Sequence, residues 1–586
     1  MAALCHGAWW PIFVVALCTV AKGADIFLEW HVAIDDTIKP VSLDQPVITI
    51  NGMFPGPLLN TTTNDYIHVN VYNDMDEPLL MTWNGIQQRL NSWQDGVSGT
   101  NCPIQPSKNW TYLFQMKDQI GTYSYFPSIN FHKAGGGFGP IRVNNRIVIA
   151  VPFPKPEAEF DLLVGDWYQQ SFKDVRNSVA NQMPNWILMN GKRPFFGPLT
   201  TSYESFNVSK GKTYRFRISN IGNAWSVNFR IQNHTMTLVE TEGSYTVQTV
   251  LDSLDVHVGQ SYSVLVTADQ NDADYYIVAS PKWVGNSSES PLAAVGILHY
   301  ENSTITADGP LPVGPDPNDI HFSIDQARSI RWNLTAGAAR PNPQGSFNVS
   351  NVTLTQTFVF QGSSAQIDGI PRYTVNNVSY TAPSTPLKLA DQFINGSGVY
   401  NLNAFPVHSS LSSAVNGTFV VSGIHKGWLE IVFNNDLDTV DSWHLDGFGF
   451  FVVGFGEGTW TPEARSTYNL YDPVFRSTIQ VYPRGWSAVY VYLDNPGMWN
   501  LRSQVLKQWY LGQELYIRVY DADPNPAKER TPPQNLLYCG LVEAPPSPPP
   551  TVTPPPSPPP PASSGVTSLS KSWFYIVISS ALAIML

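Results

Sequence analysis

The sequence is poor in charge and contains no run of basic residues. Charged side chains make up 14% of its 586 residues, against about 25% in an average soluble protein. The formal net charge of -12 argues against a nucleic-acid partner and against electrostatic adsorption to an acidic polysaccharide. Aromatic residues (12%), together with 42 glycines and 48 prolines, favour many short strands joined by turns over long helices.

Cysteine is scarce as well, and two of the four cysteines, Cys5 and Cys18, lie near the start of the chain. Residues 9–20 are largely apolar and are followed by Ala21, Lys22, Gly23 and Ala24, a pattern typical of a cleaved secretory signal peptide. A membrane-spanning anchor is the alternative, but this apolar stretch is shorter than the roughly 20 residues that a spanning helix needs. We therefore expect residues 1–24 to be removed.

After that cleavage Cys102 and Cys539 are the cysteines that remain. In an oxidising compartment, two lone cysteines most simply pair with each other. A set of N-x-S/T sequons agrees with secretion, because together they predict a glycosylated surface. Their asparagines are Asn60, Asn109, Asn207, Asn233, Asn286, Asn302, Asn333, Asn348, Asn351, Asn377, Asn395 and Asn416.

The far end of the chain carries a second processing signal. Residues 544–562 are mostly proline, which predicts an extended linker in the polyproline II conformation. Residues 563–586 follow with small residues around Ser563, a polar spacer and an apolar end. This order predicts a glycosylphosphatidylinositol (GPI) attachment signal with Ser563 as the acceptor. A single membrane-spanning helix is the alternative, although the apolar end is short for one.

The chain between these signals is too long for one hydrophobic core. Proline-rich breaks at residues 151–156 and 309–317 divide it into three predicted domains, residues 25–150, 151–317 and 318–543.

Within these domains, apolar and polar residues alternate over short segments bounded by turn residues. This alternation predicts strands, and it occurs at residues 46–50, 66–72, 213–218, 262–266, 428–433 and 488–492. Convincing amphipathic helices are scarce. The predicted fold class is therefore all-β, with each domain a sandwich.

Four further segments carry recognisable motifs: NGMFPGP at residues 51–57, GTYSY at 121–125, WHLDG at 443–447 and DNPGMW at 494–499. In this order they resemble the scaffold of the multicopper oxidase family, which includes ascorbate oxidase and laccase. The resemblance spans nearly the whole chain after the signal peptide. It implies three cupredoxin-like Greek-key β-sandwich domains, and its domain-spanning disulfide matches Cys102 and Cys539.

The family's copper sites are where the resemblance fails. Active members bind a type 1 copper through a Cys thiolate and two His, and a three-copper cluster through eight imidazoles. Here most of those ligand positions hold other residues: Thr82, Asn84, Phe126, Ser128, Asp441, Asp446, Arg502, Ser503, Gln504 and Gln508, with Gln513 at the axial position of the type 1 site. His444 is the ligand position that keeps its histidine, at a place where relatives bind the type 2 copper.

These replacements exclude a four-copper oxidase. Ser503 offers a neutral hydroxyl where a deprotonated thiol is needed, and Arg502 places a permanent cation where a metal belongs. The chain more closely resembles the plant monocopper oxidase-like proteins, through residues 24–32, 126–128 and 131–133. That branch is named for the skewed root growth of its mutants, and several of its members are GPI-anchored. The resemblance implies an extracellular role in directional cell expansion at the cell wall.

Two functions follow as hypotheses. The first is a non-catalytic protein at the cell surface that binds a cell-wall component or an extracellular protein and needs no cofactor. The second is an oxidoreductase with one copper ion at most, held by His444 with Asp441, Asp446 or Thr82. One imidazole with carboxylates is a poor copper cage, so we favour a structural His444 hydrogen-bonded to a carboxylate.

The resemblance also predicts what fills one vacated copper site. Ser128, Asp446 and Arg502 occupy three positions that would share one type 3 copper. We expect Asp446 and Arg502 to form a charge-assisted pair in place of the metal, with Ser128 adding a hydrogen bond.

Overall fold

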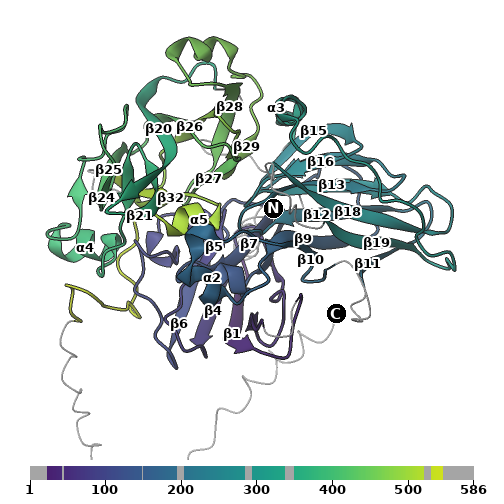
Figure 1. Cartoon of the computed structure of the whole chain (residues 1–586), viewed down its shortest axis with the longest axis horizontal. Coiled ribbons are helices and arrows are strands. Elements are labelled where there is room, and N and C mark those ends of the chain that lie inside the picture. The colour runs from purple at the N-terminus through teal and green to yellow at the C-terminus, as the bar shows by residue number, and fades with distance from the viewer. Residues whose placement is uncertain are drawn as a thin grey trace, which may run out of the picture. The chain divides into compact units, whose positions relative to one another are not determined.

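The computed structural model describes residues 23–41, 45–147, 149–193, 203–283, 293–336, 349–520 and 529–544. The predicted signal peptide (apart from its last two residues), nearly all of the proline-rich linker, Ser563, Asn286 and Asn348 lie outside these residues. Within them, no helix is long and apolar enough to cross a membrane. Strands dominate the structure (Figure 1).

The first predicted domain contains two sheets of four strands. One has the order β2-β1-β4-β6 and the other the order β3-β8-β7-β5. The bounds of these strands are β1 (Asp25–Asp35), β2 (Val47–Ile50), β3 (Leu59–Thr62), β4 (Tyr66–Asn73), β5 (Met81–Asn84), β6 (Asn109–Gln115), β7 (Gly121–Pro127) and β8 (Gly139–Asn144).

The second predicted domain also contains two sheets. Their orders are β10-β9-β12-β17-β14-β15 and β11-β19-β18-β13-β16. The bounds are β9 (Glu159–Trp167), β10 (Trp186–Met189), β11 (Glu204–Val208), β12 (Thr213–Asn220), β13 (Ser226–Ile231), β14 (Met236–Thr241), β15 (Ser244–Leu251), β16 (Leu254–Val256), β17 (Ser261–Thr267), β18 (Asp274–Lys282) and β19 (Ala294–Tyr300).

The third predicted domain contains a sheet of eight strands and a sheet of six. Their orders are β24-β22-β21-β20-β26-β31-β28-β29 and β23-β25-β33-β32-β27-β30. The bounds are β20 (Leu354–Ile367), β21 (Ile370–Val375), β22 (Val378–Tyr380), β23 (Asn401–Leu402), β24 (Val415–Gly417), β25 (Phe419–Ile424), β26 (Trp428–Asn435), β27 (Asp441–Leu445), β28 (Phe450–Glu457), β29 (Phe475–Arg476), β30 (Thr478–Val481), β31 (Gly485–Tyr492), β32 (Gly497–Ser503) and β33 (Glu514–Tyr520).

Helices are few and short in the part of the chain that is described. They are α2 (Phe172–Asn177), α3 (Ile320–Ser329), α4 (Leu387–Ile394) and α5 (Leu506–Tyr510), with 3-10 turns η1 (Ser92–Gln94), η2 (His132–Gly135), η3 (Val179–Asn181) and η4 (Pro462–Thr467). The segments that alternate in the sequence coincide with strands β2, β4, β12, β17, β26 and β31. The all-β prediction is confirmed.

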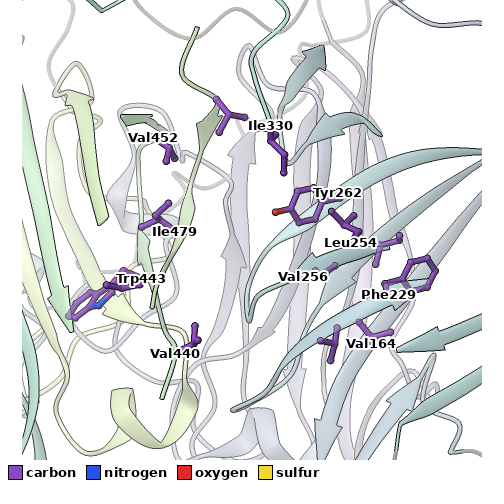
Figure 2. Close-up of a cluster of buried hydrophobic side chains, with 14 of the residues drawn as sticks. Val164, Phe229, Leu254, Val256, Tyr262, Ile330, Val440, Trp443, Val452 and Ile479 are labelled. Atoms are coloured by element: carbon purple, nitrogen blue, oxygen red, sulfur yellow. The ribbon is translucent and has the colours of Figure 1, made fainter. Parts of the chain in front are cut away.

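Each sheet takes its strands from one predicted domain, but the apolar core does not stop at the domain boundary. One buried cluster contains Val164 and Phe229 of the second domain together with Trp443 and Ile479 of the third (Figure 2). Burial of such a shared surface is the dominant favourable term in folding. The two domains therefore pack on each other through apolar side chains, while the exact boundaries near residues 150 and 317 stay predictions.

The predicted disulfide between Cys102 and Cys539 is present. It joins the first domain to the segment after β33, across 437 residues of sequence.

Candidate functional site

Strand pairing brings together two segments that contain copper-ligand positions, residues 441–446 and 502–508. β27 lies between β30 and β32 in its sheet. Its antiparallel register with β32 places His444 opposite Arg502 and Trp443 opposite Ser503. Residues 441–446 and 502–508 are therefore neighbours although about sixty residues separate them in the chain.

The four positions of the vacated type 1 site meet in one buried cluster. The hydroxyl Oγ of Ser503 lies 2.6 Å from Oδ1 of Asp441 and 3.0 Å from Oε1 of Gln508. Nε2 of Gln513 donates to Oδ2 of Asp441 over 2.9 Å. Burial raises the pKa of Asp441 to about 6, although the hydrogen bond from Ser503 acts against that rise. These hydrogen bonds link the four side chains to one another.

Arg502 fills the region of one vacated type 3 copper. Its Nη1 donates to Oδ2 of Asp446 and, over 3.0 Å, to Oδ1 of Asn500. Its guanidinium lies 4.7 Å from the ring centre of Trp509, a cation–π contact. Arg502 is fully buried and Asp446 is 3% exposed. The predicted pair of Asp446 and Arg502 is thus present.

Two further carboxyl groups, those of Asp95 and Glu514, lie near this pair. The sequence motifs pointed to neither of them. Burial, followed by the charge of Asp446, raises the pKa of Asp95 well above its ordinary value. Burial raises the pKa of Glu514 to about 7. Burial would also raise the pKa of Asp446, but the charge of Arg502 and the contact with His444 outweigh it and lower that pKa. Asp446 is therefore the ionised partner of Arg502.

The prediction for Ser128 is wrong. Its hydroxyl donates to the backbone carbonyl of Gly96 over 2.6 Å, and no hydrogen bond to Arg502 is found among the described residues. Ser128 directly follows β7, and its short side chain reaches the neighbouring loop at Gly96. The third polar partner of Arg502 is instead Asn84, whose Oδ1 lies 3.4 Å from Nη2.

The remaining vacated positions also have protein neighbours. Nε2 of Gln504 donates to Oδ1 of Asn84 over 2.7 Å. Phe126 packs under the buried amine of Lys133, whose Nζ lies 4.5 Å from the ring centre. Burial lowers the pKa of Lys133 to about 7. Thr82, opposite Phe126 across β5 and β7, is buried, and its hydroxyl has no hydrogen-bond partner among the described residues.

His444 is buried between a hydroxyl and a carboxylate. Its Nδ1 lies 2.8 Å from Oγ1 of Thr478. Its Nε2 lies 3.0 Å from Oδ1 of Asp446, without the geometry of a hydrogen bond. Burial lowers the pKa of His444, so the ring is neutral near pH 7. His444 thus lies beside a carboxylate, but the predicted hydrogen bond to that carboxylate is not found among the described residues. Asp441 belongs to the other cluster.

This donor set does not fit copper. No group of three His, Cys, Asp or Glu side chains converges on one point in the described residues. The carboxylate nearest to His444 is already paired with the guanidinium of Arg502, and a metal cation there would meet a fixed positive charge. At the type 1 position, the hydroxyl of Ser503 replaces the thiolate that copper prefers, and the carboxyl group of Asp441 and the amide of Gln508 replace the two imidazoles.

Family models identify the scaffold on which these sites are built. Three models, each described as multicopper oxidase, match residues 33–147, 159–303 and 384–525. The chain belongs to the multicopper oxidase family. Its three domains are cupredoxin-like, as the motifs predicted.

Relatives in this family align with most of the chain. The monocopper oxidase-like protein SKU5 of Arabidopsis thaliana is 49% identical over 518 residues, which cover 86% of this chain and 88% of that protein. The monocopper oxidase-like protein SKS1 of the same plant is 46% identical over 539 residues, 90% and 91% of the two chains. The L-ascorbate oxidase of Cucumis sativus is 28% identical over 519 residues, 81% and 86% of the two chains.

Solved structures of the family show the same fold. Fet3p, a multicopper oxidase that functions in iron import, superposes with a TM-score of 0.72 at 22% identity, over 87% of this chain and 93% of that one. The laccase of Botrytis aclada superposes with a TM-score of 0.71 at 23% identity, over 85% and 88%. At these identities the comparison establishes the multicopper oxidase fold alone.

The motifs of the sequence did not point to several residues of this multicopper-oxidase-like site. Asp95, Asn500, Trp509 and Glu514 lie outside the ligand motifs, and they reach Arg502 or Asp446 through the tertiary fold. A weak signal existed for Asp95, which is the one charged residue between Arg89 and Lys108.

Proposed function

We propose that the chain is a cell-surface glycoprotein that uses the multicopper oxidase fold for binding, without multicopper oxidase catalysis. Its partner would be a cell-wall component or an extracellular protein, and its role directional cell expansion. The monocopper oxidase-like relatives support the family branch. The catalytic part of the proposal rests on the structure of the vacated sites.

The single observation that carries the proposal is the cluster of Asp441, Ser503, Gln508 and Gln513. Electron transfer in the family begins at a thiolate-bound copper. Here each of these side chains is engaged by another member of the cluster. The type 1 copper accepts the first electron in the family's reaction. With Ser503 in place of the thiolate, this chain has no ligand set for that copper.

The exposure of the sequon asparagines is consistent with the proposed glycosylation outside the cell. Most described sequon asparagines are exposed: Asn60, Asn109, Asn207, Asn233, Asn302, Asn351, Asn395 and Asn416. Asn333 and Asn377 are half-buried. A disulfide is typical of secreted proteins. GPI attachment near Ser563 and location at the outer face of the plasma membrane and cell wall remain part of the proposal, supported by the sequence pattern.

A mononuclear copper protein is the alternative that the sequence left open. The copper ligands suggested for it do not converge on one point. Asp441 accepts a hydrogen bond from Ser503, and Asp446 is paired with Arg502. The geometry therefore favours the non-catalytic function.

Elemental analysis tests this choice directly. The secreted protein is loaded with copper, dialysed and analysed, and its oxidation of phenols and ascorbate is measured against a heat-inactivated control. We expect close to no copper per chain, no blue absorption band and no turnover above the control. One copper per chain that is lost in His444→Gln would establish the mononuclear copper protein instead.

A further inference from the structure

One face of the sheet β2-β1-β4-β6 in the first domain is open to solvent. Along β1, β4 and β6, which lie side by side (Figure 1), more exposed residues alternate with more buried ones. Successive side chains of a strand point to opposite faces of its sheet, so the more exposed set shares one face. We call it the outer face, and it consists of every second residue of the ranges 25–31, 66–72 and 109–115, counted from the first of each.

Two rows of rings cross the outer face. Phe27 of β1 lies opposite His68 of β4, and their rings are stacked with centres 4.3 Å apart. Further along the same strands, His31 lies opposite Tyr72, and these rings are stacked with centres 4.5 Å apart. A strand rises about 3.3 Å per residue, so the two ring rows are about 13 Å apart.

A row of hydrogen-bonding groups lies between the ring rows. It consists of Glu29, Asn70 and Thr111, which the registers of the three strands place side by side. Oδ1 of Asn70 accepts a hydrogen bond from Oγ1 of Thr111 over 3.2 Å. Glu29 is exposed, and its carboxylate has no hydrogen-bond or ion-pair partner among the described residues.

The rings of the outer face are accessible. Phe27 is 73% exposed, and the side chain of His31 is 54% exposed. β2 pairs with β1 at residues 32–35, beyond both ring rows. A single exposed apolar residue is ordinary, but rows of stacked rings gathered on one flat face indicate an interaction site.

The charge of the outer face selects among ligands. Asp25 and Glu29 belong to it, and none of its residues is Lys or Arg. Nε2 of His68 lies 3.1 Å from Oδ1 of Asp25, and Nδ1 of His31 lies 2.7 Å from Oδ2 of Asp74. Each imidazole therefore already faces a carboxylate. An anionic ligand would be repelled here, whereas carboxylates accept hydrogen bonds from hydroxyl groups.

A chain of sugar rings combines the groups that these rows require. A pyranose ring with equatorial hydroxyls has C–H groups on its two faces and hydroxyls around its edge. The C–H faces pack on aromatic rings, and the hydroxyls exchange hydrogen bonds with carboxylates and amides. A β-1,4-linked glucan is an extended ribbon that can follow a flat sheet, whereas an α-1,4-linked glucan coils away from it.

We propose that the outer face binds an uncharged β-1,4-linked polysaccharide. Sugar rings pack on the rows of Phe27 and His31, and hydroxyl groups between them bond to Glu29 and Asn70. The proposal rests on the proposed function, for which it names the cell-wall component. Binding is non-covalent and involves none of the vacated copper positions.

The chain's own glycan is the competing occupant. Asn109 begins a sequon and lies on β6 opposite Tyr72, at one corner of the outer face. Its Nδ2 donates to Oδ1 of Asn70 over 2.8 Å. Phe27 is two strands across and one ring row along from this corner. A glycan on Asn109 therefore begins far from the most exposed ring, which favours an external polysaccharide at that ring.

Titration calorimetry with cellohexaose tests the proposal on the mature glycosylated protein. Maltohexaose has the same glucose units in α-1,4 linkage, and a hexamer of galacturonic acid carries negative charge. We expect cellohexaose to bind at least about fivefold more tightly than either, the effect of one ring contact. No binding of cellohexaose, or equal or tighter binding of either comparison sugar, overturns the proposal.

Variants locate the site. Phe27→Ala and His31→Ala should each weaken cellohexaose binding about fivefold. Tyr471→Ala is the matched control, because Tyr471 is a 65% exposed ring of the third domain, and it should leave binding unchanged. Both test residues are exposed, so the fold should survive, which thermal unfolding checks. If one test variant is unstable the other decides, and unchanged binding in a folded test variant contradicts the proposed site.

Asn109→Gln separates the two occupants. It removes the sequon's acceptor and should leave cellohexaose binding unchanged. Binding that appears in Asn109→Gln and is absent from the parent would show that the chain's own glycan covers the outer face, and the proposal would then be wrong.

The two proposals fail separately. Copper is measured on the same preparation. Cellohexaose binding by a protein that carries copper would refute the non-catalytic function and keep the polysaccharide site. A copper-free protein that does not bind cellohexaose would do the reverse.

Discussion

Arg502 and Asp446 form a buried ion pair where active relatives would hold a type 3 copper. Arg502 lies on β32, and Asp446 directly follows β27, the strand beside it. Nη2 of Arg502 reaches Asn84 of the first domain over 3.4 Å. A guanidinium thus takes over the position of a metal at the junction of the first and third domains.

Removing one partner of this pair should destabilise the folded protein. Arg502→Ala leaves the carboxylate of Asp446 buried without its cation, and we expect a loss of about 3–5 kcal/mol in the free energy of unfolding. The double variant Arg502→Ala with Asp446→Ala should lose clearly less than the sum of the single variants. Denaturant unfolding of the four proteins measures this coupling.

A surface pair serves as the control for that cycle. Nη1 of Arg331 lies 2.6 Å from Oδ1 of Asp472, but the side chain of Arg331 is 45% exposed. Exposed pairs contribute little, so alanine substitutions there should be nearly additive. Additive losses at Arg502 and Asp446 as well would show that the buried pair is not coupled.

The disulfide should be a major source of stability. Cys102 and Cys539 close a loop across 437 residues, and the chain-entropy model gives such a loop about 6 kcal/mol. The variant Cys102→Ser with Cys539→Ser should therefore unfold at a much lower denaturant concentration. An unchanged midpoint would mean that the cysteine pair does not constrain the unfolded chain.

Glu514 should make stability fall as pH rises through the mildly acidic range. Its pKa is about 7 in the folded protein, against an ordinary value of 4.5. Between these values the folded state binds a proton that the unfolded chain has lost. The free energy of unfolding should therefore decrease by about 3 kcal/mol from pH 4.5 to 7 through this group, and change no further above pH 7.

Glu514→Gln isolates that contribution. The amide oxygen can still accept the hydrogen bonds from Asn500 and Trp509 that the carboxyl group accepts over 2.7 and 2.9 Å. The variant should have a flatter stability profile than the parent between pH 4.5 and 7, whereas the exposed Glu29→Gln should follow the parent. Parallel profiles for Glu514→Gln and the parent would contradict the raised pKa.

The GPI prediction can be checked on cells. A phosphatidylinositol-specific phospholipase should release the protein, because a lipid near Ser563 would be its sole attachment. Replacing residues 563–565 with bulky residues should prevent attachment. A protein that resists the phospholipase and alkaline extraction carries a spanning helix instead.

The sequence predicted the fold through local patterns. Alternation at residues 66–72 predicted a strand, because a strand with one buried face requires a period of two. The strand predicted at residues 428–433 is also present, but it is buried on both faces. The motif positions also identified which side chains replace copper ligands, and they anticipated the contact of Asp446 with Arg502. Ser128 shows the limit of that reasoning, since its hydroxyl satisfies a nearby carbonyl instead.

By itself, the sequence determined that the family scaffold is kept and that most copper-ligand positions hold other residues, because both are written in the motifs. The tertiary structure decided what those positions became. Asp95 and Glu514 enter the site from other parts of the chain, and their protonation depends on burial. Burial and strand register are properties of the folded chain, so no local pattern contains them.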